Sequence, residues 1–143
     1  MEGMRDKGMG KKQAKERACE MLDLVELDRK FLYRYPHEAS GGECQRAAIA
    51  RALAVEPQLL ICDEATSALD VTVQAQIAAL LKRRQEENGM SLLLISHDLA
   101  LVQYLCSRVL IMYQGKIIEE GIPDEVIQNP RESYTRLLVE AIL

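Results

Sequence analysis

Two adjacent carboxylates follow a short apolar run near the middle of the sequence. Leu59 to Cys62 is apolar, Pro57 stands before the run, and Asp63 and Glu64 come directly after it. A run of this length predicts a buried strand whose carboxyl end carries both acids, the end at which α/β proteins bind ligands. We expect Asp63 to hold Mg²⁺, directly or through water, and Glu64 to orient or deprotonate an attacking water. Acids also occur where strands simply end, so the pair needs partners elsewhere in the chain.

A glycine pair at a predicted helix start is the first such partner. Ser40 is a favoured N-cap residue, and Gly41 and Gly42 leave backbone amides unshielded before Glu43. The positive end of the helix dipole lies at the same place. The segment SGGECQR, residues 40–46, could therefore cradle a phosphate.

A histidine after a second apolar run is the other partner. His97 follows the run Leu92 to Ile95, so it stands at the same kind of strand end as Asp63. By its position alone, His97 is more often a polar residue at the start of the next helix than a functional group.

The hydrophobic periodicity predicts the elements that position these residues. Asp70 suits the N-cap of the helix after the acids, and Asn88 with Gly89 suits its end. Gln114 and Gly115 suit a hairpin turn. We expect helices over residues 11–26, 42–55, 71–87, 98–106, 123–129 and 131–143, a short helix and turn over 28–36, a buried strand over 90–96, and hairpin strands over 108–112 and 116–120.

Composition limits the function classes. The 143 residues suit one domain with a modest core, and the net charge of −4 does not favour a general nucleic-acid binder. No apolar stretch approaches the roughly 18 residues of a membrane helix, and no signal peptide is recognisable. The four cysteines form no C-x-x-C pair, which suits reduced thiols. We therefore expect a cytoplasmic protein.

Four short motifs occur together in a fixed order. SGGECQR looks like the signature sequence of ABC transporter ATPases, LLICDE like their Walker B strand, SALD like their D-loop, and SHD like their switch-histidine loop. From about residue 37 to the C-terminus, the chain resembles the nucleotide-binding subunits of ABC transporters. RYPHEASGGECQRAAIARALAVEP and NPRESYTRLL more narrowly resemble the branch that imports peptides and nickel.

This resemblance implies a fold and a set of roles. The fold would be α/β, a partial P-loop NTPase core of the ABC type (RecA-like), with part of the helical signature subdomain at 1–57 and the C-terminal part of the core at 58–143. ATP and Mg²⁺ would be bound between two subunits. The implied site residues are Glu64 and His97 for catalysis, Asp63 for Mg²⁺, and Ser40, Gly41, Gly42, Glu43 and Asp70 for nucleotide contacts and the subunit seam.

The resemblance also implies partners. They would be a second ATPase subunit, identical or different, the membrane-spanning permease subunits, and a solute-binding protein reached through the permease. Nucleic acid is not among them. The subunit would lie peripherally on the inner face of the cell membrane and energise import of peptides, nickel or related small solutes.

Some features depart from the family pattern. Ala39 stands where a larger apolar residue is usual, and Ala65 stands where a proline is usual. Gly3 and Gly8 have P-loop spacing, but Met9 occupies the lysine position and no strand precedes them, so we expect a frayed terminus over residues 1–10. Without a P-loop, a Q-loop or an adenine-stacking segment, the chain alone is not expected to bind ATP tightly or to hydrolyse it.

Two other readings remain open from the residues. One is a non-catalytic half-domain that pairs with or regulates a complete ABC ATPase. The other is the C-terminal lobe of a DNA-repair or chromosome-maintenance ATPase, although the stretch before Ser40 lacks the sustained heptads of their coiled coils.

Overall fold

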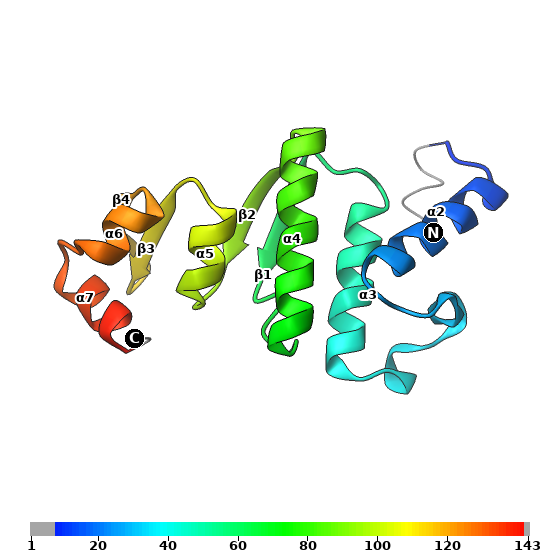
Figure 1. Cartoon of the computed structure of the whole chain (residues 1–143), viewed down its shortest axis with the longest axis horizontal. Helices are drawn as coiled ribbons and strands as arrows, with labels where there is room; N and C mark the ends of the chain where they lie inside the picture. Colours follow the sequence, from blue (N-terminus) through cyan, green and yellow to red (C-terminus); the bar gives the residue numbers. More distant parts are fainter. Residues whose placement is uncertain (1–7, 142–143) are drawn as a thin grey trace. The chain divides into compact units, whose positions relative to one another are not determined.

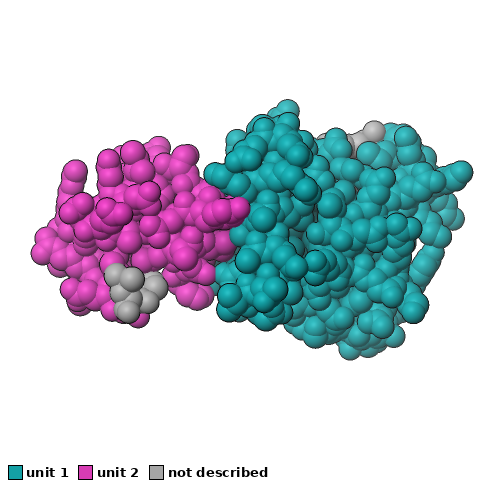
Figure 2. Space-filling view, viewed as in Figure 1, with its two compact units in different colours: residues 1–93 teal, residues 94–143 magenta. Residues whose placement is uncertain are grey.

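The computed structural model describes residues 8–141, which fall into two compact units. The first unit runs up to Leu93 and the second begins at Leu94 (Figure 2). The segment from Gly3 to Gly8, which has the glycine spacing of a P-loop, lies largely outside the described residues. So does the end of the helix predicted over 131–143. The division into 1–57 and 58–143 stays a prediction.

The elements occur in the predicted order (Figure 1). Their bounds differ from the predicted ones by a few residues. The first part of the chain forms α2 (Lys11–Leu24), the 3₁₀ helices η1 (Arg29–Tyr33) and η2 (Pro36–Glu38), α3 (Gly41–Leu53), β1 (Leu59–Asp63), α4 (Val71–Asn88) and β2 (Ser91–Ile95). The second part forms α5 (Leu99–Leu105), β3 (Val109–Tyr113), β4 (Lys116–Gly121), α6 (Pro123–Gln128) and α7 (Ser133–Glu140). Among residues 8–141, no helix combines the length and the apolar character needed to cross a membrane.

Helices α2 and α3 lie next to each other in the first unit (Figure 1). Met21 and Val25 at the end of α2 are each 2% exposed, and Ile49 and Leu53 of α3 are 5% and 4% exposed. Burial of side chains this large contributes about 1.5–3 kcal/mol each. The apolar periodicity of the two helices therefore accounts for their association.

A guanidinium group closes the C-terminal end of α2. Arg46 of α3 donates from Nη1 to the carbonyl oxygens of Val25, at 3.1 Å, and Glu26, at 2.8 Å. Glu26 has a left-handed φ of 54°, which ends the helix. The cation thus satisfies carbonyls that the helix itself leaves without a partner.

Strands β1 and β2 form a two-stranded sheet. The Ser91 amide donates to the Gln58 carbonyl at 2.8 Å, so the strands begin side by side and run in the same direction, with α4 as the crossover. Leu60 is 7% exposed, but Ile61 is 59% exposed. The prediction of fully buried strands is therefore wrong for one face, because only one side of the sheet is covered among the described residues.

The hairpin of the second unit forms as predicted. Strands β3 and β4 pair antiparallel, with Tyr113 opposite Lys116. Gln114 and Gly115, between them, have φ values of 48° and 76°. Two successive left-handed residues are what a two-residue hairpin turn of type I′ requires.

A buried carboxylate holds the start of α7. Glu119 of β4 is 9% exposed and accepts hydrogen bonds from the backbone amides of Arg131, at 2.9 Å, and Glu132, at 3.1 Å. These amides precede the first turn of α7. A negative charge at the N-terminal end of a helix is stabilising, and the sequence pattern did not indicate this contact.

Substitutions at adjacent positions of β1 test the one-sided burial. Leu60→Ala should lower the free energy of unfolding by about 2–5 kcal/mol, because it leaves a cavity under the sheet. Ile61→Ala should cost less than about 1 kcal/mol, because most of that side chain is already in water. Equal costs in chemical denaturation would contradict the exposed face.

Candidate functional site

Asp63 and Glu64 lie at the carboxyl end of β1, and both are exposed. Glu64 has a φ of 49°, in the left-handed region that side chains other than glycine rarely adopt. Its carbonyl oxygen accepts hydrogen bonds from the Ser67 amide, at 3.2 Å, and the Ser67 hydroxyl, at 2.9 Å. A tight turn therefore fixes the backbone from which the Glu64 carboxylate projects.

The Asp63 carboxylate at the end of β1 offers the kind of oxygen ligand that Mg²⁺ prefers. Among residues 8–141, no three His, Cys, Asp or Glu residues are grouped as a metal site. Mg²⁺ is commonly held by one or two carboxylates together with substrate phosphates and water. The Asp63 carboxylate therefore fits a magnesium ion that arrives with a nucleotide.

A reciprocal capping box forms at the start of α3. The Ser40 hydroxyl oxygen accepts from the Glu43 amide at 3.3 Å, while the Glu43 carboxylate accepts from the Ser40 amide at 2.8 Å and the Ser40 hydroxyl at 2.9 Å. These bonds lower the pKa of the Glu43 carboxyl below its ordinary value, the Ser40 amide having the largest effect. The amides of Gly41 and Gly42 make no hydrogen bond within residues 8–141, so they can donate to an anion.

The first turn of α3 lies against the loop that follows β1. A Cβ atom added at Gly42 would lie 3.2 Å from the Ala68 carbonyl oxygen and 3.4 Å from Cδ2 of Leu69. The Ala68 amide donates to Oε1 of Gln45 at 3.2 Å. The structure thus brings together the segments that resemble the signature (residues 40–46) and the D-loop (residues 67–70).

Sequence reasoning did not single out Gln45. One signal was available: Gln45 follows Gly41 by four residues and Gly42 by three, so the three lie on one helix face. A polar side chain on the face that carries the glycines was the feature that could have identified it.

Asp70 caps α4, as predicted. Its side chain accepts from the Val73 amide at 3.0 Å. At the other end of α4, Gly89 adopts a φ of 64°, which confirms the predicted stop. A contact of Asp70 with a second subunit stays a prediction.

His97 lies between β2 and α5 and is exposed. It belongs to the second compact unit, whereas the other predicted site residues belong to the first. Asp98 beside it caps α5 by accepting from the Leu101 amide at 3.0 Å. The strand-end position of His97 is confirmed, and its role stays a prediction.

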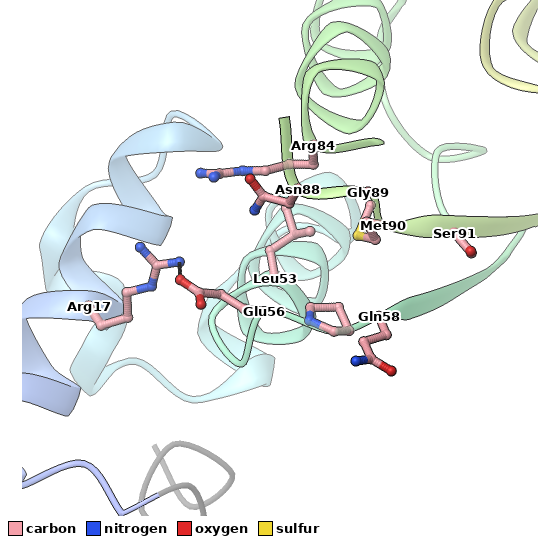
Figure 3. A pocket seen from close by; sticks show the side chains of 10 residues that line it. Arg17, Leu53, Glu56, Gln58, Arg84, Asn88, Gly89, Met90 and Ser91 are labelled. Atoms are coloured by element: carbon pink, nitrogen blue, oxygen red, sulfur yellow. Dashed lines mark hydrogen bonds and ion pairs between the residues drawn. The ribbon is translucent and has the colours of Figure 1, made fainter. Parts of the chain in front are cut away.

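A polar cavity of about 750 Å³ lies elsewhere in the first unit (Figure 3). Gln58 and Ser91 at its wall adjoin the amino ends of β1 and β2, opposite to the strand end that carries Asp63. None of the predicted site residues lines it. Its lining consists of Arg17, Leu53, Glu56, Pro57, Gln58, Arg84, Asn88, Gly89, Met90 and Ser91.

The capping box should make stability depend on pH through Glu43. A carboxyl whose pKa is lowered in the folded state contributes stability that is present above the ordinary value of 4.5 and is lost as the pH falls through the lowered pKa. Glu43→Gln keeps a capping side chain without the charge. Thermal unfolding from pH 3 to 7 should therefore show a smaller acid loss in Glu43→Gln, and parallel curves would exclude the effect.

The two glycines should respond differently to substitution. Gly42→Ala pushes a methyl group against the Ala68 carbonyl, whereas at Gly41 the nearest atom to an added Cβ is 4.0 Å away. The change from glycine to alanine favours a helix equally at both positions, so any difference in stability between the two variants comes from packing. We expect Gly42→Ala to have the lower free energy of unfolding, measured in urea, and the reverse order would contradict the close approach.

Comparisons with known proteins identify relatives of this chain. The family model described as "ABC transporter" matches residues 2–67. Oligopeptide transport ATP-binding protein OppF of Escherichia coli is 51% identical over 134 residues, which are 94% of this chain and 40% of that protein. OppF of Bacillus subtilis is 48% identical over 92% of this chain and 43% of its own length. A putative peptide import ATP-binding protein of Brucella ovis is 46% identical over 99% of this chain and 45% of its own length.

Solved structures give the same result for the fold. The ATP-binding cassette MJ0796, in a dimeric post-hydrolysis state bound to ADP and Pi, superposes with a TM-score of 0.75 at 34% identity. The superposition covers 80% of this chain and 49% of that chain. This chain spans less than half the length of these relatives. In sequence and in its α/β fold, the chain belongs to the ABC transporter family and corresponds to part of a P-loop NTPase cassette.

Proposed function

We propose that this chain is part of the ATP-binding subunit of an importer of oligopeptides. The observation that carries the proposal is the identity of 46–51% with proteins named for peptide import, over more than nine tenths of this chain. Peptides are thus better supported as the solute than nickel, the second solute that the motifs indicated.

The residues of the site have separate roles in this proposal. Asp63 binds the Mg²⁺ that accompanies ATP, and Glu64 orients or deprotonates the attacking water. His97 contacts the γ-phosphate. The exposed position of Asp63 and Glu64 at a strand end supports these roles, because such ends are where α/β proteins bind ligands.

The signature segment acts on the nucleotide of a second subunit. The amides of Gly41 and Gly42 at the start of α3 close over its phosphates, with Ser40 and Glu43 holding the helix end in place. Asp70 lies at the seam between the subunits. The amides without internal partners support this role, as does the dimeric state named for the MJ0796 cassette.

Further partners follow from the same proposal. The subunit associates with membrane-spanning permease subunits and lies peripherally on the inner face of the membrane. The permease in turn receives solute from a solute-binding protein. The support is the transport function in the names of the relatives, which also favours this reading over a chromosome-maintenance ATPase.

A second candidate is a non-catalytic partner of a complete ABC ATPase. The observation that favours it is the pair of Gly41 and Gly42 amides, which make no hydrogen bond within residues 8–141 and could close over a nucleotide held by the complete subunit. Capture of an intact family subunit by this chain, dependent on ATP and lost in Ser40→Arg, would support this candidate.

A chimera tests the importer proposal. This chain replaces the matching 134 residues of Escherichia coli OppF, in cells that lack the native subunit. We expect oligopeptide uptake and ATP hydrolysis to be restored. Glu64→Gln in the chimera should lower the ATPase rate at least about 100-fold, because a general base typically contributes that much or more.

Two controls make the chimera informative. Glu87→Gln, at the end of α4 away from Asp70, changes one charge outside the proposed site and should leave uptake intact. The purified chain alone should not turn over MgATP. A chimera that is assembled in the membrane and still hydrolyses no ATP would contradict the importer proposal, as would full activity of the Glu64→Gln form.

A further inference from the structure

We propose that Gln45 is a positioning residue that holds the backbone of Glu64 and the D-loop against the first turn of α3. The proposal rests on the proposed role of Glu64 in activating water. It adds a residue that acts through the main chain of the residues to which we assign contacts with nucleotide and water.

The Gln45 side-chain amide reaches three groups in the loop after β1. The Ala68 amide donates to Oε1 at 3.2 Å. Nε2 lies 3.4 Å from the Ser67 hydroxyl oxygen and 3.5 Å from the Glu64 carbonyl oxygen. Because a backbone N–H can only donate, the Ala68 contact decides which end of the Gln45 amide is oxygen.

The Glu64 carbonyl oxygen is the point at which these contacts meet. It accepts from the Ser67 amide and the Ser67 hydroxyl, and Nε2 of Gln45 is a third, longer contact. Glu64 has a left-handed φ, which persists only where surrounding contacts impose it. Ser67 supplies the local contacts, and Gln45 ties the same turn to a different element.

The geometry of α3 makes this reach possible. Gly42 has no side chain, which lets the Ala68 carbonyl oxygen come close to the helix. A Cβ atom added at position 42 would lie only 3.2 Å from that oxygen. Gln45 is one helical turn further along the same face, and its side chain has the length to span the remaining distance to the Ala68 amide. A movement of the first turn of α3 is therefore transmitted to the Glu64 backbone.

Amide hydrogen exchange of the full chain, followed by NMR without nucleotide, tests the proposal. Gln45→Leu removes both the donor and the acceptor, so the Ala68 amide should exchange about fivefold faster, the effect of losing one ordinary hydrogen bond. Gln45→Glu keeps an acceptor for Ala68 and should restore its slow exchange. The amides of Ile49 and Ala50, later in α3, should be unchanged in both variants.

Two results would overturn the proposal. One is unchanged exchange of Ala68 in Gln45→Leu. The other is faster exchange of Ala68, Ile49 and Ala50 together in both variants, which would mean that Gln45 only stabilises the helix. If Gln45→Leu does not fold, Gln45→Asn, one methylene shorter, gives the same comparison. Since no nucleotide is present, the result is independent of whether the OppF chimera hydrolyses ATP.

Discussion

The close approach of α3 to the loop after β1 is the constraint on which the candidate site depends. Gly42 lets the Ala68 carbonyl come within contact distance of the helix backbone, and the Gln45 amide bonds the loop there. A larger residue at position 42 would separate the two segments. The Gly41 and Gly42 amides and the Glu64 backbone, to which we assign separate roles, thus lie on two segments that these contacts hold together.

Apolar burial supplies most of the energy that holds this region in place. The apolar side chains on and next to α2 and α3 are at most 5% exposed at Met21, Val25, Ile49 and Leu53. Exposed ion pairs such as Arg29 with Asp23, 2.6 Å apart, contribute little, because water screens both charges. The polar contacts therefore decide geometry, and the apolar contacts decide stability.

Several helix ends are completed by side chains, and they differ in where the partner comes from. Ser40 and Asp70 cap the helices that they precede, using donors three residues away. Arg46 and Glu119 instead satisfy helix ends from another element, the former at the end of α2 and the latter at the start of α7. Both kinds of cap reduce the number of backbone groups without a partner.

Local features of this protein could be predicted from the sequence. The caps at Ser40 and Asp70, the stop at Gly89, the hairpin turn at Gln114 and Gly115, and the strand-end positions of Asp63 and His97 all depend on residues within a few positions of one another. Hydrogen bonding and steric preference act over that range. The order of the motifs likewise identified the family without any coordinates.

Only the tertiary structure decided the contacts between distant residues. The bond between Gln45 and Ala68 spans 23 positions, and no local pattern specifies it. The exposure of Ile61 was equally unpredictable, because an apolar run looks the same whether one face of a strand is covered or both. Sequence patterns determine which elements form, whereas the backbone approach at Gly42 and the covering of each face depend on how those elements pack.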